Sequence, residues 1–409
     1  SVACSNASHR ADAVSEFPGC LKELCVMSTA ERLETEGPAV AKLRGVLACS
    51  LIERDAEIEA LLLGLVAGEH VLLVGPPGTA KSHLCRSVAA AVEGCRYQER
   101  LMSPTTPPEA LFGPISLSAL REDRYEHVSA GSITDAEMVF LDEFFRGSDA
   151  VCDTLLHLLG PERQALVGTQ MVKAPLRSCV GASNSWADNA GQQAIMDRWL
   201  IRRTVRPVSP QGRDRLMFST IPDVTPVCTL ADIEATAMLA RSMAVSDEAK
   251  IALGQILDEL GSEGIRPSDR RCRQSVKIAR AAAAIDGASE VGVGHLECLR
   301  DVLWDTPEQA DKAGEIVVKI ANPVGAKINS LLSDVDAIVR EAGNDAATRL
   351  SALKKLQDCE SQAKKLTADG NGRAAKAYDF VKRERVRLQA ITLGMDPDKA
   401  LTMMEGGAG

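Results

Sequence analysis

The feature that most limits what this chain can fold into is an apolar run that ends in a glycine-rich turn and leads directly into a helical pattern. The run is His70–Val74, the turn is Gly75–Gly78, and the helical pattern covers Lys81–Val92. Short apolar runs closed by glycine are typical of buried parallel strands. The order strand, glycine loop, helix therefore predicts an α/β fold in which the loop lies at the edge of a parallel sheet.

The glycine loop carries residue types that hold phosphate. It reads Gly75-Pro76-Pro77-Gly78-Thr79-Ala80-Lys81-Ser82, and His83 follows. Small residues let backbone N–H groups wrap a phosphate, and the next helix points its positive dipole end at the anion. We expect Lys81 to reach the β- and γ-phosphates and Ser82 to bind Mg²⁺. Ala80 stands where such loops usually have glycine, and the simpler interpretation is a turn that only joins a strand to a helix.

Two further apolar runs end in polar residues. Asp142 and Glu143 follow Met138–Leu141, and Asn184 comes shortly after Cys179–Ala182. The carboxyl ends of parallel strands meet at one edge of a sheet, so we expect these side chains beside the glycine loop. Asp142 would then hold Mg²⁺ through water, Glu143 would polarise an attacking water as a general base, and Asn184 would orient that water. The alternatives are a solvated acidic pair and a turn asparagine.

Arginines follow in two places. Arg198 lies in a predicted helix, residues 193–200, before a predicted strand at residues 201–205. An arginine supplied by a neighbouring subunit can stabilise the charge of a phosphoryl-transfer transition state, and Arg202, Arg203 and Arg206 are alternatives to Arg198. Each of these side chains is otherwise an ordinary surface arginine.

The second arginine site is Ser268-Asp269-Arg270-Arg271, which opens a predicted helix with Ser268 or Asp269 as its cap. An arginine here could reach back to the γ-phosphate, so that closure of a helical lid senses the nucleotide. We favour Arg270, and Arg271 stays open.

Beyond Pro210 the alternation of strands and helices stops. Helical patterns cover residues 230–244, 247–260, 270–285 and 293–303, and three further apolar stripes follow them. We expect four parts: a disordered or extraneous tail at residues 1–36, an α/β core at 37–210, an all-α lid at 211–305, and a helical hairpin or bundle for partner or ring contacts at 306–409.

Composition narrows the classes of partner. The net charge is −9, from 47 basic and 56 acidic residues, which disfavours nucleic acid as the main ligand. No window approaches the roughly 18 apolar residues that a membrane span needs, and there is no pattern of a secretory signal. The twelve cysteines are scattered, as expected of reduced thiols in a cytoplasmic protein.

The ordered motifs resemble those of the AAA+ superfamily, more narrowly the MoxR group, and most of all its RavA-like branch. The AAA+ resemblance rests on Gly75–Ser82, Leu141-Asp142-Glu143, Ala182-Ser183-Asn184, Asp197-Arg198 and Ser268–Arg271. The narrower resemblance rests on Phe112-Gly113-Pro114, Tyr125-Glu126, Gly131, Glu162-Arg163-Gln164 and Val172–Arg177. It covers roughly residues 38–305.

The resemblance implies a five-stranded core with a helical lid, in a hexameric ring with ATP between subunits. It assigns ATP and Mg²⁺ binding to Lys81, Ser82 and Asp142. It makes Glu143 the base, Asn184 sensor 1, Arg198 the arginine finger and Arg270 sensor 2. Residues 112–131 and 162–176 match an insert and a hairpin that would face the pore or the partner.

The same resemblance implies a chaperone-like motor that remodels or assembles a protein partner beside a von Willebrand factor A domain protein. Residues 306–409 do not match the partner-binding domain of RavA-like chains. Two other hypotheses remain: a nucleotide-gated scaffold with slow hydrolysis, and a motor directed to nucleic acid.

Overall fold

The computed structural model describes residues 38–123, 127–167, 170–187, 195–342, 346–367, 372–393 and 395. The predicted tail at 1–36 and the Tyr125-Glu126 pair lie outside these ranges. The chain divides into two compact units. The first contains the described residues up to Ala249 together with Arg266–Ala310, and the second contains Lys250–Ile265 together with the described residues from Asp311 onward.

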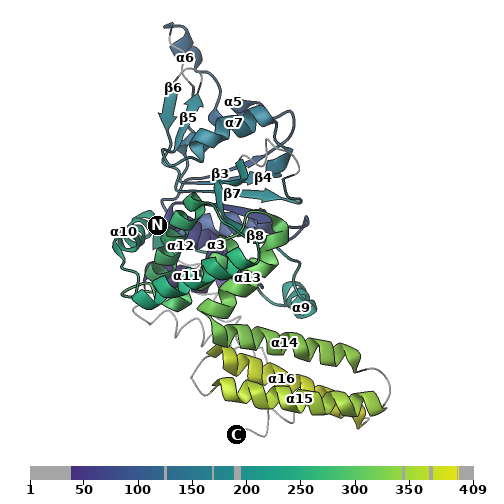
Figure 1. Cartoon of the computed structure of the whole chain (residues 1–409). Coiled ribbons are helices and arrows are strands. Elements are labelled where there is room, and N and C mark those ends of the chain that lie inside the picture. Colours follow the sequence, from purple (N-terminus) through teal and green to yellow (C-terminus); the bar gives the residue numbers. More distant parts are fainter. Residues whose placement is uncertain are drawn as a thin grey trace, which may run out of the picture. The chain divides into compact units, whose positions relative to one another are not determined.

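The first unit is built on a five-stranded sheet in which all neighbouring strands are parallel (Figure 1). The strand order is β3-β4-β7-β1-β8. The strands are β1 His70–Val74, β3 Tyr97–Leu101, β4 Met138–Asp142, β7 Ser178–Ser183 and β8 Trp199–Thr204. This arrangement confirms the predicted α/β class, and it puts the carboxyl ends of β1, β4 and β7 at one edge.

Both faces of the sheet are covered, which explains why its central strands are almost entirely buried and mostly apolar. On one face, Leu72, Val139 and Cys179 join a core with residues of α5 (Pro108–Phe112) and α7 (Asp149–Leu158). On the other face, α3 (Asp55–Ala67) comes so close that a Cβ on its Gly64 would lie 2.6 Å from Val71 Cγ2. Figure 1 shows α7 and α3 on opposite sides of the sheet.

The remaining elements of the first unit are short strands and helices around this sheet. The helices before and within the α/β part are α2 Ala39–Ser50, α3 Asp55–Ala67, α4 Lys81–Ala90, α5 Pro108–Phe112, α6 Leu117–Leu120, α7 Asp149–Leu158 and α9 Pro210–Phe218. The 3-10 turns are η2 Ile133–Asp135 and η3 Phe144–Arg146. The strand pairs are β2 Val92–Glu93 with β9 Cys228–Thr229, and β5 Gln164–Val167 with β6 Gln170–Lys173.

A helical layer completes the first unit. It consists of α10 Leu230–Ser242, α12 Asp269–Ile285 and the 3-10 helix η4 Val293–Asp301. Helix α12 packs against α10, η4 and α3. Thr229 and Asp232 form a capping box on α10, and the Ser268 hydroxyl accepts from the Arg271 N–H at the start of α12. The predicted serine cap is therefore present.

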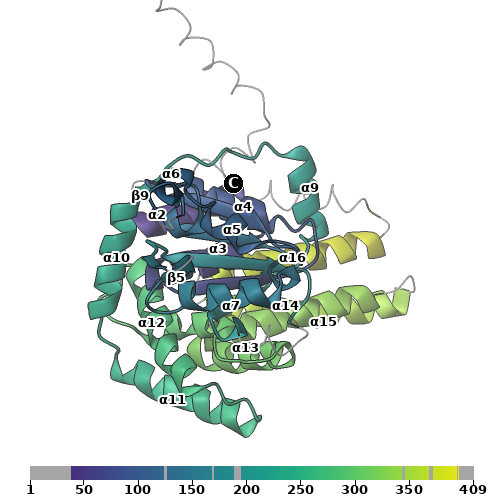
Figure 2. The ribbon, with the colours of Figure 1, turned by 90° about the horizontal axis from the view of Figure 1, so that it is seen from above.

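The second unit contains most of α11 Asp247–Ser262 and of α13 Pro307–Ala321, and all of three longer helices. These are α14 Pro323–Glu341, α15 Ala346–Leu366 and α16 Gly372–Thr392. They pack pairwise around a shared apolar core and run alongside one another in both views (Figures 1 and 2). The prediction of two or three packed helices in the tail is confirmed.

Some element predictions were wrong in detail. Helix α4 ends at Ala90, because Val92 pairs with Cys228 in β2–β9. The helix predicted over 193–200 is wrong at its end, since Trp199 and Leu200 are buried residues of β8. The edge strand β3 was missed because its sequence, YQERL, contains no apolar run.

Among the described residues, no helix is both long and apolar enough to cross a membrane.

Candidate functional site

The carboxyl edge of the sheet brings three polar strand ends together. Gly75 follows β1, Asp142 closes β4, and Asn184 follows β7. The Gly75 N–H donates to the Ser183 carbonyl at 3.0 Å, which joins the glycine loop to the end of β7. The sequence prediction that these residues share one edge is confirmed.

The glycine loop requires small residues for identifiable reasons. A Cβ on Gly75 would lie 2.2 Å from the Val205 carbonyl oxygen, and Gly78 adopts a φ of 78°. Ala80 also adopts a left-handed conformation, with φ 64°, as the residue that precedes α4. No side chain caps this helix, so the backbone N–H groups of its first turn face outward from its N-terminus.

Lys81 is held at the centre of the site. Its Nζ donates to the carbonyls of Gly75 at 2.7 Å and Pro76 at 3.0 Å, and it lies 3.4 Å from Asn184 Oδ1. Only 8% of Lys81 is exposed. Burial lowers the pKa of Lys81, and the nearby carboxylates Asp142 and Glu143 oppose that shift. The ammonium group of Lys81 thus lies beside the N-terminus of α4, which no side chain caps.

Asn184 joins the lysine to the acidic strand end. Its Nδ2 donates to Glu143 Oε1 at 2.6 Å, while its Oδ1 faces Lys81. Glu143 has a φ of 51°, and its N–H donates to Asp142 Oδ1 at 3.0 Å. One amide side chain therefore spans the cation and the carboxylate of this site.

The residues fit a magnesium-bound triphosphate. The open N–H groups of α4 and the Lys81 ammonium are donors for phosphate, and the Ser82 hydroxyl and Asp142 carboxylate are hard oxygen ligands. The Thr79 hydroxyl donates to Pro76 at 2.9 Å and shapes the loop, while His83 is exposed on α4.

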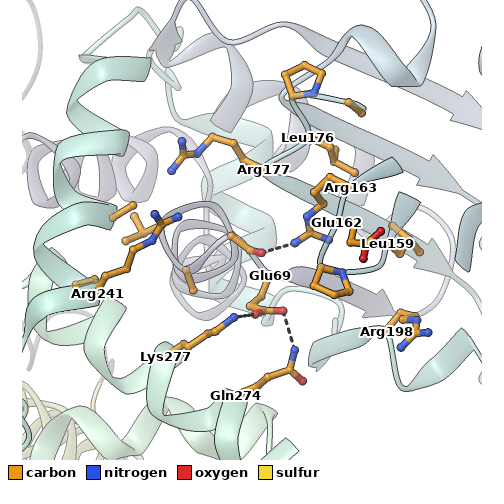
Figure 3. A pocket seen from close by; sticks show the side chains of 18 of the residues that line it. Glu69, Leu159, Glu162, Arg163, Leu176, Arg177, Arg198, Arg241, Gln274 and Lys277 are labelled. Carbon is orange, nitrogen blue, oxygen red and sulfur yellow. Dashed lines mark hydrogen bonds and ion pairs between the residues drawn. The ribbon is translucent and has the colours of Figure 1, made fainter. Parts of the chain in front are cut away.

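Arg198 and Arg270 lie at the opposite edge of the sheet from the glycine loop. They line a pocket of about 750 Å³ whose wall includes Gly68 and Glu69, the residues that precede β1 (Figure 3). Arg270 Nη1 bonds Asp197 Oδ2 at 3.1 Å, next to Arg198. The expectation that Arg270 reaches back to the phosphates of its own chain does not match this placement, because α12 packs beside the amino ends of β1 and β8.

This pocket is strongly cationic. Its carboxylates are Glu69 and Glu162, and Glu69 is paired with Lys277 at 2.8 Å. Its cations include Arg177, Arg198, Arg241, Arg270, Lys277 and Arg280. Burial and the neighbouring Arg270 both lower the pKa of Arg198, and the Nε–H groups of Arg177, Arg198 and Arg280 have no partner among the described residues. The pocket therefore presents more cationic groups than carboxylates to an anion.

The other arginines of these motifs have different roles. Arg202 is 2% exposed and bonded to backbone carbonyls, and Arg203 pairs with Asp301 at 3.1 Å. Neither side chain is free to reach a neighbouring subunit. Arg271 is 1% exposed, so the Arg270–Arg271 doublet divides into one pocket residue and one buried residue. Sequence reasoning missed this division, and no signal in the sequence marks it.

Comparison with known proteins agrees with this geometry. A family model described as the MoxR domain in the MoxR-vWA-beta-propeller ternary systems matches residues 39–221, and an AAA lid domain model matches residues 250–317. The uncharacterised protein MJ0812 of Methanocaldococcus jannaschii is 32% identical over 69% of this chain and 75% of its own length. MJ0079 of the same organism is 30% identical over 86% of this chain and 90% of its own length.

More distant similarities point the same way. Chaperone MoxR1 of Mycobacterium tuberculosis is 26% identical over 41% of this chain and 44% of its own length. The crystal structure of a candidate ATPase from Cytophaga hutchinsonii superposes with a TM-score of 0.57 at 16% identity, over 74% of this chain and 98% of that one. That likeness shows the fold alone.

A parallel sheet of this order, with a glycine loop after its β1 strand and a helical lid domain, defines a P-loop ATPase of the AAA+ class. Within that class, residues 39–221 match the MoxR domain, and this match and the MoxR1 relative support membership of the MoxR family.

Proposed function

We propose that this chain binds ATP with Mg²⁺ at Gly75–Ser82 and hydrolyses it with Asp142, Glu143 and Asn184. The observation that carries the proposal is the side chain of Asn184, which spans Lys81 and Glu143 at the carboxyl edge of the sheet. That bridge puts a phosphate-binding cation and a general base on either side of one amide.

Each residue has a defined part in the proposed reaction. Lys81 and the open N–H groups of α4 bind the β- and γ-phosphates, and Glu143 accepts a proton from the water that attacks the γ-phosphorus. Asn184, which contacts both Lys81 and Glu143, orients that water. The magnesium ion, held by Ser82 and Asp142 when bound, would neutralise charge on the phosphate oxygens.

We also propose that Arg198 and Arg270 act on the nucleotide of a neighbouring copy of the chain. Both side chains belong to the cationic pocket at the far edge from their own glycine loop. An arginine placed there supplies transition-state charge only when another subunit brings its nucleotide to it. Hydrolysis would then require a ring, which we take to be a hexamer by resemblance.

The work done by this ATPase would be chaperone-like remodelling of a protein partner in the cytoplasm. The matching family model comes from systems that include a vWA protein, and one relative is a chaperone, so a von Willebrand factor A domain protein is the proposed partner. Helix α6 and the β5–β6 hairpin expose apolar side chains suited to contact with a protein surface. The exposed side chains are Leu117 and Leu120 of α6, and Leu166 and Met171 of the hairpin. The Glu162-Arg163-Gln164 motif supports a place in the RavA-like branch.

The first prediction tests this proposal with three variants. Lys81→Ala should lose nucleotide binding by calorimetry, because it removes the cation from the loop. Glu143→Gln should bind Mg·ATP but not turn it over. Arg198→Ala should bind ATP normally and lose about 10³-fold in turnover.

Turnover per chain of the wild type should rise with protein concentration as the subunits assemble. Arg121→Ala, an exposed arginine on the C-terminal side of α6, serves as the control and should change nothing. Full turnover by a chain that stays monomeric at every concentration would refute the shared site.

A further inference from the structure

We propose that two buried arginines, Arg202 and Arg271, are positioning residues that hold the backbone on both sides of Arg198 and so fix where its guanidinium points. This inference rests on the proposed function, since it explains how Arg198 is kept ready for a neighbouring nucleotide. It assigns Arg271, the second member of the doublet, a role distinct from that of Arg270.

Arg202 holds the segment around Arg198 from within β8. Its Nη2 donates to the Met196 carbonyl at 2.8 Å, and its Nε donates to the Trp199 carbonyl at 3.1 Å. These residues lie two before and one after Arg198. A single guanidinium therefore closes the short turn that carries Arg198.

Arg271 holds the same segment from α12. Its Nη1 donates to the Leu200 carbonyl at 3.0 Å, and its Nη2 lies 3.7 Å from Asp197 Oδ1. Asp197 is also paired with Arg270. Of the residues from 196 to 200, every one except Arg198 is thus contacted by Arg202, Arg270 or Arg271.

Both buried arginines anchor this segment to a second one, Val302–Asp305. Arg271 Nη1 donates to the Val302 carbonyl at 2.9 Å, and its Nε lies 3.3 Å from Asp305 Oδ1. Arg202 Nη1 donates to the carbonyls of Trp304 at 3.0 Å and Asp305 at 2.9 Å. The Arg202 guanidinium also stacks over the Trp304 ring, 5.5 Å from its centre.

Arg202 and Arg271 differ from Arg198 in how deeply their side chains are buried. Arg202 and Arg271 are almost inaccessible, so neither can touch a nucleotide on another subunit. Burial lowers the pKa of Arg202 to about 9, and the neighbouring Arg271 adds to the effect. Two adjacent buried cations are costly unless their N–H groups are bonded. All three Arg202 nitrogens donate to carbonyls, whereas only Nη1 of Arg271 does, and its Nε and Nη2 face the carboxylates of Asp305 and Asp197 without a hydrogen bond.

The arrangement has a consequence for catalysis. An arginine that stabilises transition-state charge works best when its position is fixed before the substrate arrives. If either buried arginine is replaced, the 196–200 turn loses partners on both sides of Arg198. The P-loop at the other edge of the sheet keeps its own contacts.

The test uses the full chain with Arg271→Met and, as the matched control, Arg273→Met, an exposed arginine of the same helix. We expect Arg271→Met to bind Mg·ATP within about twofold of wild type while its kcat falls at least tenfold, and Arg273→Met to retain both. Arg202→Met should behave like Arg271→Met. If Arg271→Met does not fold, Arg271→Lys replaces it. A lysine keeps the charge, but its single nitrogen cannot contact the Leu200 and Val302 carbonyls and also the Asp197 and Asp305 carboxylates.

A mixing experiment separates positioning from a general loss of structure. Arg271→Met chains keep an intact P-loop, while Lys81→Ala chains keep intact arginines. An equimolar mixture should recover about a quarter of wild-type turnover, because about one random interface in four joins a working P-loop to working arginines. The expected outcome is recovery with Lys81→Ala and none with Arg198→Ala.

Several results would overturn the inference. The first is a wild-type kcat in both Arg271→Lys and Arg271→Met. The second is a loss of nucleotide binding in Arg271→Met. The third is a mixture of Arg271→Met and Lys81→Ala chains that stays inactive. Failure of the proposed function is distinguishable, since the wild type would then lack turnover or Arg198→Ala would keep it.

Discussion

Two residues of the candidate site adopt the left-handed backbone conformation that side chains disfavour. Ala80 has φ 64° and Glu143 has φ 51°. For an L-residue this conformation costs about 1–2 kcal/mol. Strain of this kind persists where the surrounding structure fixes the backbone conformation. Here Ala80 directly precedes Lys81, and Glu143 directly follows Asp142. The strained positions and the proposed chemistry therefore coincide.

Ala80→Gly should raise stability, because glycine adopts φ 64° without the Cβ penalty. The gain should be about 0.5–1 kcal/mol after the greater entropy of glycine in the unfolded chain is subtracted. Thermal melting of the two proteins checks it. Ala67→Gly, at the right-handed end of α3, is the control and should lower stability by up to about 1 kcal/mol. Equal losses in both variants would contradict a strained Ala80.

At the residue scale, the sequence predicts the carboxyl-edge site well and the arginine site poorly. Asp142, Glu143 and Asn184 follow apolar runs, and parallel strands place such ends together. The position of Arg270 depends instead on where α12 packs, which no local pattern encodes. The burial of Arg271 runs against the general exposure of arginine, so only its backbone partners reveal it.

At the scale of elements, close packing between α3 and the sheet holds the strand that carries the glycine loop. A Cβ on Gly64 would meet Val71 Cγ2 at 2.6 Å, the Glu69 carbonyl at 3.1 Å and Ser178 Oγ at 3.2 Å. Glycine is thus used here for close approach between a helix and two strands. No local pattern in the sequence reveals which glycine of the helices faces the sheet.

Gly64→Ala and Gly45→Ala should therefore have opposite effects. The first overpacks the α3–β1 contact and should destabilise the chain by about 1–3 kcal/mol. The second lies within α2 with nothing near its Cβ position, so it should stabilise by about 0.5–1 kcal/mol through helix propensity. Chemical denaturation of both variants tests the pair. A neutral Gly64→Ala would mean that α3 is free to shift away from β1.

Strands with a clear apolar run were predicted from the sequence, whereas strands that depend on pairing with a neighbouring strand were not. Strands β1, β4 and β7 are apolar runs between turns, which explains their prediction. Strand β3 is an edge strand of intermediate exposure, and it exists because it pairs with β4 along its whole length. Trp199 and Leu200 fit a helical or an extended pattern equally well, and pairing with β1 decides between them.

At the scale of the whole molecule, the chain has more than one independent core. One core gathers residues of the sheet, α5 and α7. A separate core joins α14, α15 and α16, with Val335, Leu356 and Val381 almost fully buried. Separate cores allow a substitution in one to leave the packing of the other unchanged.

The last prediction concerns this second core. A fragment of residues 322–395 should fold alone into a helical protein with a cooperative thermal transition, because its three helices bury one another. The side chain of Asn322 caps α14 by accepting from the Gly325 N–H at 2.7 Å, and Arg385 pairs with Glu360 between α16 and α15. Within the fragment, Leu356→Ala should cost about 2–4 kcal/mol, since its side chain is fully buried.

Leu350→Ala provides the matched control on the same helix, and should change stability by less than about 0.5 kcal/mol because Leu350 is 67% exposed. Circular dichroism during thermal melting measures both. Equal effects of the two substitutions, or a fragment without a cooperative transition, would mean that α14–α16 need the rest of the chain to form their core. A fragment that folds would instead isolate this unit for partner-binding assays, free of the ATPase site.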